Sequence, residues 1–195
     1  MNIDTIKIEE HPFEAFVPKN ATILIVGSFP GKEQTNKNAD PDQWFYGAKR
    51  NQFWKILSAA YNLELKTKED KQNLFRNFGI GITDILLKIQ RKNNSNLDNN
   101  LVIKETNEKK IKKILEDNNI TRILFTSKYV EILFLKYFPD TKNYSCLLSP
   151  SGGANIPISK SEEYITYKKE NPGKNTIDFR IHQYKLLINL NSNSQ

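Results

Sequence analysis

The feature that most limits how this chain can fold is an unbroken apolar segment, ATILIV, at residues 21–26. A continuous apolar run rich in β-branched residues is typical of a strand buried on both faces of a parallel sheet. The run leads directly into the loop Gly-Ser-Phe-Pro-Gly at residues 27–31. We therefore expect a buried parallel strand whose carboxyl end carries a glycine-rich loop.

Other segments alternate between strand and helix patterns. Further strands are predicted at residues 79–87, 120–125 and 144–148, and helices at 52–61, 106–117, around 132–134 and at 176–190. This alternation favours an α/β fold, a three-layer α/β/α sandwich around a central four-stranded, mainly parallel sheet. No internal repeat or long linker interrupts the pattern, so we expect residues 1–195 to form one domain.

Composition narrows the class of protein. The chain of 195 residues has no apolar run near the roughly 20 residues of a membrane span, and its N-terminus lacks a signal-peptide pattern. Its one cysteine, Cys146, allows no internal disulfide. We expect a soluble cytoplasmic protein, and a monomer because no exposed apolar stripe is evident.

The net charge of +7 favours a polyanionic partner, although a solvated lysine-rich surface would give the same balance.

Two loops could carry chemistry. The loop at 27–31 is not a nucleotide-binding P-loop, because only three residues separate its glycines and Glu33 follows Lys32. A second loop, SPSGGAN at 149–155, offers serine hydroxyls and glycine backbone suited to a phosphate. Each loop alone would also fit an ordinary turn. Ligands bind at the carboxyl ends of parallel strands, so we expect both loops at one edge of the sheet.

Between these loops, the segment YGAKRN at 46–51 places an aromatic ring, two cations and an amide close together. Aromatic stacking combined with phosphate neutralisation is typical of nucleic-acid pockets. The two histidines, His11 and His182, have no partners at metal-ligand spacing, so we expect no metal and no cofactor. His11 is expected to support the fold. No G-x-S-x-G nucleophile elbow occurs.

Together these segments resemble the uracil-DNA glycosylase superfamily. ILIVGSFPG resembles its first motif and LLSPSGGAN its second, while FYGAKRNQFWKIL and GITDILLKIQRKNNSNLDNNL are similar to the mismatch-specific and hypoxanthine-type branches. The similarity covers roughly residues 11–187. It implies an enzyme that flips out a deaminated or mispaired base in DNA and hydrolyses its N-glycosidic bond.

The resemblance also implies roles for individual residues. Asn51 matches the catalytic, water-handling asparagine of the hypoxanthine branch, and Tyr46 matches the ring that stacks on the flipped base. The implied base-binding residues are Ser28, Phe29, Tyr46 and Asp84; the implied phosphate-binding residues are Lys49, Arg50, Ser149, Ser151, Gly152 and Gly153; and Asn155 or Ile156 would fill the gap left in the base stack.

The sequence departs from the family pattern at Phe29, where many branches have a water-activating Asn or Asp, and at Ala48, Leu147 and Leu148. With these departures, a non-catalytic DNA-binding protein of the same fold would also fit the sequence. An enzyme acting on a free nucleoside or small glycoside is disfavoured by the Lys49–Arg50 pair. An interaction protein without a site is disfavoured by the two glycine loops.

Overall fold

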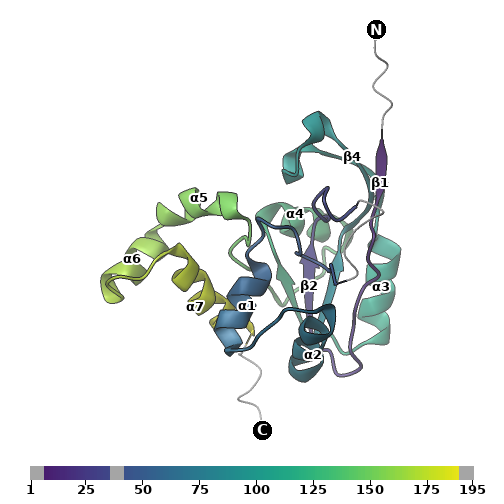
Figure 1. Cartoon of the computed structure of the whole chain (residues 1–195). Coiled ribbons are helices and arrows are strands. Elements are labelled where there is room, and N and C mark those ends of the chain that lie inside the picture. The colour runs from purple at the N-terminus through teal and green to yellow at the C-terminus, as the bar shows by residue number, and fades with distance from the viewer. Residues whose placement is uncertain (1–6, 36–41, 189–195) are drawn as a thin grey trace.

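The structure, a computed structural model, describes residues 7–35 and 42–188 (Figure 1). Its central sheet has four strands in the order β3-β2-β6-β7, and every pair of neighbours is parallel. The strands are β2 (Ile23–Gly27), β3 (Ile80–Asp84), β6 (Arg122–Phe125) and β7 (Tyr144–Cys146). The predicted four-stranded parallel sheet is confirmed, with strand bounds that differ by one to three residues at most ends.

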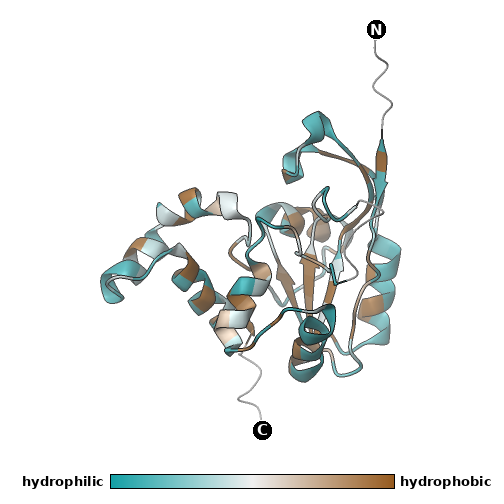
Figure 2. Ribbon diagram, viewed as in Figure 1, coloured by the Kyte–Doolittle hydropathy of each residue, from teal (hydrophilic) through white to brown (hydrophobic). Residues whose placement is uncertain are grey.

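Helices cover both faces of this sheet. Successive side chains of a strand point to opposite faces, so a strand that is apolar throughout needs a cover on each face. Ile23 and Ile25 of β2 belong to one buried cluster and Leu24 and Val26 to another. The first cluster includes residues of α1 (Phe53–Tyr61), α2 (Lys68–Phe78) and α7 (Thr176–Ile188), and the second includes residues of α3 (Glu108–Asp117) and α4 (Lys128–Tyr137). Figure 2 shows the apolar strands between these layers, which confirms the predicted sandwich.

A second sheet was not predicted. It is antiparallel, in the order β1-β4-β5, and consists of β1 (Ile8–Glu10), β4 (Leu86–Arg91) and β5 (Leu101–Thr106). The single apolar run expected at 79–87 is divided: β3 ends at Asp84, and the chain turns into β4 at Leu86. The connection from β4 to β5 contains the short 3₁₀ turns Lys92–Asn94 and Asp98–Asn100.

Helices α2, α5 (Asn155–Ser159) and α6 (Glu162–Glu170) were also not predicted. The start of α2 carries a capping box, in which Thr67 and Asp70 satisfy each other's backbone N–H groups. The expected end of the last helix, residues 189–190, lies outside the described residues. No helix in the described ranges is long and apolar enough to cross a bilayer.

Candidate active site

The carboxyl edge of the central sheet brings three strand ends side by side. Gly27 at the end of β2 pairs in register with Asp84 at the end of β3. On the other side, the backbone N–H of Thr126, which follows β6, donates to the carbonyl of Val26 at 3.2 Å. Gly27 is therefore flanked by a carboxyl group and a hydroxyl group at the edge where ligands of parallel sheets bind.

The space in front of Gly27 is occupied by two polar groups. A Cβ added there would lie 2.1 Å from the Tyr46 hydroxyl and 2.3 Å from Asp84 Oδ1. Only glycine fits such an approach. The Tyr46 hydroxyl donates to Thr126 Oγ1 at 3.1 Å, and its ring stacks on Phe53 with centroids 4.3 Å apart. Burial, followed by the nearby Asp84, raises the pKa of Tyr46 well above its usual value, so the phenol remains a hydrogen-bond donor.

Asp84 is buried and only half satisfied. Its Oδ2 contacts His11 Nε2 at 2.9 Å, and the two side chains are 5% and 4% exposed. Its Oδ1 is buried and has no hydrogen-bond partner among the described residues. Buried carboxylate oxygens without a donor are rare in folded proteins and occur preferentially at functional sites. Asp84 Oδ1 is thus an acceptor that no described protein group satisfies.

The first glycine loop is fastened by the polar connection between β4 and β5. The Ser28 hydroxyl donates to Asp98 Oδ1 at 2.6 Å, and Arg91 donates to the carbonyl of Pro30 at 2.6 Å. The backbone N–H of Lys32 donates to Asn96 Oδ1 at 3.0 Å. Burial raises the pKa of Asp98, and hydrogen bonds from the Ser28 and Ser127 hydroxyls oppose that shift. These contacts hold residues 28–32 in one conformation.

Phe29 contributes a ring and a backbone amide to this loop. The ring packs edge-on against His11 at 5.5 Å and lies 5.7 Å beneath the Arg91 guanidinium. No described residue accepts a hydrogen bond from the backbone N–H of Ser28 or of Phe29. The backbone N–H groups of Ser28 and Phe29 are therefore left without an acceptor among the described residues.

Asn51 lies beside the second loop. Its Oδ1 accepts a hydrogen bond from the backbone N–H of Phe53 at 2.9 Å, which satisfies an otherwise free donor at the start of α1. Its backbone forms an antiparallel bridge with Ser151 in the second loop. Because Oδ1 is used in the hydrogen bond to Phe53, Nδ2 is the part of the amide left for a ligand. Lys49 and Arg50, just before it, are exposed.

The second loop is shaped by its own hydroxyl groups. Ser149 Oγ accepts from the backbone N–H of Ser151 at 3.3 Å, and Ser151 Oγ accepts from that of Gly153 at 3.3 Å. Each hydroxyl therefore keeps its own O–H for donation outward. Gly152 lies against the neighbouring segment, since a Cβ there would be 3.3 Å from the carbonyl of Arg50. Gly152–Ala154 forms a short 3₁₀ turn.

Helix α7 supports this loop from below, which sequence analysis missed. The Tyr184 hydroxyl donates to the carbonyl of Leu148 at 2.9 Å. Arg180, which is 0% exposed, donates to Gln52 Oε1 and, at 3.3 Å, to the carbonyl of Ser151. Among the described residues no carboxylate pairs with Arg180, and desolvation lowers its pKa. A buried positive charge thus lies directly under the second loop.

The two wedge candidates differ in their surroundings. Asn155 Oδ1 accepts a hydrogen bond from the Thr176 hydroxyl at 3.1 Å, so its side chain ties α5 to α7. Ile156 is 67% exposed on α5. Of the two, Ile156 is the side chain that projects from the surface.

The sequence-predicted residues therefore lie in two groups, and Asn51 adjoins the second through its bridge to Ser151. Ser28, Phe29, Tyr46 and Asp84 surround the first loop, and Lys49, Arg50, Ser149, Ser151, Gly152 and Gly153 form or adjoin the second. His11, Asp98 and Arg180 belong to the same region and were not predicted as site residues. Within the described part of the chain, no group of three His, Cys, Asp or Glu residues could hold a metal ion.

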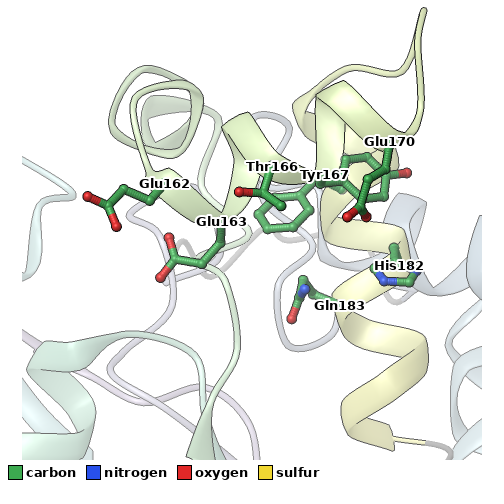
Figure 3. Close-up of a pocket in the computed structure, with 8 residues that line it drawn as sticks. Glu162, Glu163, Thr166, Tyr167, Glu170, His182 and Gln183 are labelled. Carbon is green, nitrogen blue, oxygen red and sulfur yellow. The ribbon is translucent and has the colours of Figure 1, made fainter.

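A separate cavity of about 470 Å³ lies between α6 and α7 (Figure 3). Its lining includes the carboxylates Glu162, Glu163 and Glu170, together with Tyr167 and His182. Negative side chains disfavour a phosphate backbone. The sheet edge, with its glycine loops and cations, is the better candidate for an anionic ligand.

Comparison with known proteins agrees with the fold. No protein-family model matches the chain, and a search of curated proteins finds no similar sequence. Among solved structures, the chain is similar to the solution NMR structure of a Methanosarcina acetivorans protein provisionally described as a uracil DNA glycosylase. The TM-score is 0.63 and the identity 19%, over 93% of this chain and 99% of the other. The chain therefore shares the fold of that protein.

Proposed function

We propose that this protein is a DNA glycosylase that flips a deaminated or mispaired base out of DNA and hydrolyses its N-glycosidic bond. The observation that carries the proposal is the buried, unpartnered Oδ1 of Asp84, which lies at the sheet edge beside Gly27 and Tyr46. The fold shared with the provisionally described glycosylase and the net charge of +7 support it.

The polar groups at the first loop complement one kind of base edge. Asp84 Oδ1 accepts a hydrogen bond, whereas the backbone amides of Ser28 and Phe29 donate. A base with adjacent N–H and C=O groups, as in uracil or hypoxanthine, offers the matching donor and acceptor. Tyr46 would stack on the flipped base. We therefore favour lactam bases as substrates.

The second loop and its neighbours would hold the DNA backbone. Lys49 and Arg50 neutralise phosphates, and the hydroxyls of Ser149 and Ser151 with the amides of Gly152 and Gly153 donate to phosphate oxygens. Arg180 adds a buried positive charge beneath them. Ile156, with Asn155 at its base, would fill the space vacated by the flipped nucleotide.

In the hydrolysis itself, water adds to the sugar C1′ as the bond to the base breaks. The sugar gains oxocarbenium character, and the base leaves with the bonding electrons and takes up a proton. Asn51 Nδ2 would hold the attacking water, since Oδ1 already accepts a hydrogen bond from the Phe53 N–H. No metal or other cofactor is needed for this step.

A substitution at Asn51 separates chemistry from the hydrogen bond that Asn51 makes to α1. Asn51→Asp keeps an oxygen that can accept from the Phe53 N–H but lacks the Nδ2 donor, whereas Asn51→Ala loses this hydrogen bond as well, at about 0.5–1.5 kcal/mol. We expect both variants to bind DNA and to excise the base far more slowly, with reduced stability only in Asn51→Ala. The measurement is single-turnover cleavage of duplexes carrying uracil, hypoxanthine or a G·T mismatch, followed by alkali. Native turnover in both variants would refute the role of Asn51.

Phe29 favours a second candidate, a DNA-binding protein of the same fold that does not cleave. Its ring is packed against His11 and Arg91 where many related enzymes have a polar side chain, so the first loop supplies no side-chain group to activate water. Salt-sensitive binding to the same duplexes without cleavage of any would identify such a binding protein.

A further inference from the structure

The sequence predicts only a fold-supporting role for His11, yet it is the one described residue that hydrogen-bonds the Asp84 side chain. It follows β1 and is enclosed by aromatic rings, with centroids at 5.9 Å for Phe13, 5.5 Å for Phe29 and 5.6 Å for Phe45. Its Nε2 lies 2.9 Å from Asp84 Oδ2. Its Nδ1 lies 2.8 Å from the carbonyl oxygen of Phe13 and 3.1 Å from the backbone nitrogen of the same residue.

The contact between Nε2 and Oδ2 requires one proton between these two atoms. If Nδ1 donates to the Phe13 carbonyl, that proton makes either an imidazolium facing a carboxylate or a neutral imidazole facing a carboxylic acid protonated on Oδ2. If Nδ1 instead accepts from the Phe13 N–H, Nε2 carries the proton and Asp84 is a carboxylate. In all three arrangements Asp84 Oδ1 carries no proton. It can therefore only accept a hydrogen bond.

We infer that His11 is a positioning residue that keeps Asp84 Oδ1 a hydrogen-bond acceptor and thereby restricts the site to bases presenting an N–H at that edge. This inference rests on the proposed function and adds a determinant of base specificity to it. Lactam bases such as uracil and hypoxanthine present this N–H. Cytosine and adenine present a ring nitrogen acceptor at the corresponding position, which an acceptor-only oxygen repels.

The surroundings of Asp84 explain why its carboxyl group needs a hydrogen-bond donor such as His11. The Tyr46 hydroxyl faces Asp84 but donates to Thr126, and Asp98 is a second carboxyl group whose charge acts on the same region. The exposed carboxyl group of Glu14 also interacts electrostatically with His11. Without His11, Asp84 would be buried and would have no hydrogen-bond donor on either carboxyl oxygen. Both conditions favour the neutral acid, which could then carry its proton on Oδ1 and donate it.

The first test needs no DNA. The ¹³C resonance of the Asp84 carboxyl group is followed between about pH 5 and pH 9 in the native protein, His11→Phe and His11→Gln, with His182→Phe as a control that removes the other histidine. We expect Asp84 to titrate as an isolated acid in His11→Phe only, because a glutamine amide can still donate to Oδ2. If His11→Phe fails to fold, His11→Asn, whose amide is too short to reach Oδ2, replaces it. Indistinguishable Asp84 titrations in the native and His11 variants would overturn the inference.

The second test measures specificity by equilibrium binding, so that it does not depend on cleavage. Duplexes carrying an unpaired uracil or an unpaired cytosine at the same position are compared at about pH 6 and pH 8. We expect the native protein and His182→Phe to bind the uracil duplex more tightly at both pH values. In His11→Phe, we expect the ratio of the two affinities to fall by about tenfold at the lower pH and to return to the native ratio at the higher pH. An unchanged preference in His11→Phe at both values would overturn the inference while leaving the glycosylase intact. Absence of DNA binding by the native protein would instead contradict the proposed function, and the carboxyl titration would still decide the role of His11.

Discussion

Gly27→Ala is the substitution that most directly tests how the first loop is built. The new methyl group would lie 2.1 Å from the Tyr46 hydroxyl and 2.3 Å from Asp84 Oδ1, closer than any real Cβ contact. Neither group is free to move away: Tyr46 stacks on Phe53 and bonds Thr126, and Asp84 is held by His11. Overpacking of a buried site costs about 1–3 kcal/mol.

Displacing Tyr46 also breaks its hydrogen bond to Thr126, which adds about 0.5–1.5 kcal/mol. We therefore expect Gly27→Ala to lower the free energy of unfolding by about 2–4 kcal/mol. For a chain of this size, each kcal/mol lowers the melting temperature by roughly 2–4 °C, so the expected fall is about 4–16 °C. Base excision should be lost together with this stability, because both groups that face the base are moved.

The assay is urea denaturation together with single-turnover excision. Gly153→Ala serves as the stability control, since its Cβ would meet only Ser151 Oγ at 3.7 Å, an ordinary contact. Adding Tyr46→Phe to Gly27→Ala removes the atom at 2.1 Å and leaves ring carbon Cζ at 3.1 Å. The double variant should therefore recover about 1–2 kcal/mol of the loss. Native stability and native excision in Gly27→Ala would refute the placement of Tyr46 and Asp84.

Three further predictions concern the surroundings of the site. Arg180→Met should cost about 1–3 kcal/mol, because it leaves Gln52 Oε1 unpaired and removes one of the two hydrogen bonds to the Ser151 carbonyl, and it should weaken DNA binding; native affinity would contradict the electrostatic role of Arg180. The folded-state pKa of Asp98 is raised above its usual value of 3.8, so this carboxyl group favours folding below that pH and the contribution is lost as the pH rises. Asp98→Asn should therefore gain stability relative to the native protein as the pH rises above 3.8, as followed by thermal melting, and a constant difference would refute this. Lys49→Ala and Arg50→Ala should leave stability unchanged and each reduce the salt dependence of DNA binding by about one unit of slope; unchanged slopes would exclude phosphate contacts.

The central sheet could be predicted because its strands are buried on both faces and therefore read as apolar runs. β4 and β5 were missed because they are partly exposed and carry charged and polar residues: β4 ends in Gln90 and Arg91, which begin a run of polar residues typical of a loop. Helix α2 was missed for a related reason. Only Lys71, Leu74 and Phe75 of its residues are buried, so its apolar face is narrow.

The two loops at the sheet edge followed from the parallel topology, since strands of one direction end at one edge. The contacts that shape the site did not follow from sequence patterns, because they join residues far apart in the chain. His11 and Asp84 are separated by 73 positions, Ser28 and Asp98 by 70, and Arg180 and Gln52 by 128. Periodicity reports on neighbours along a helix or strand and carries no information about such pairs. For Asp98 and Arg91 the sequence held a signal only in the family resemblance, because both lie in the segment GITDILLKIQRKNNSNLDNNL.

The most direct test of the proposed glycosylase activity is to detect the released base. The purified native protein is incubated with duplexes carrying uracil, hypoxanthine or a G·T mismatch, and free base and intact DNA are measured by mass spectrometry. We predict release of a lactam base, an equal amount of abasic strand, and loss of both products with Asn51→Asp. Bound but unmodified DNA with every duplex, at concentrations where the protein saturates them, would contradict the proposed hydrolysis.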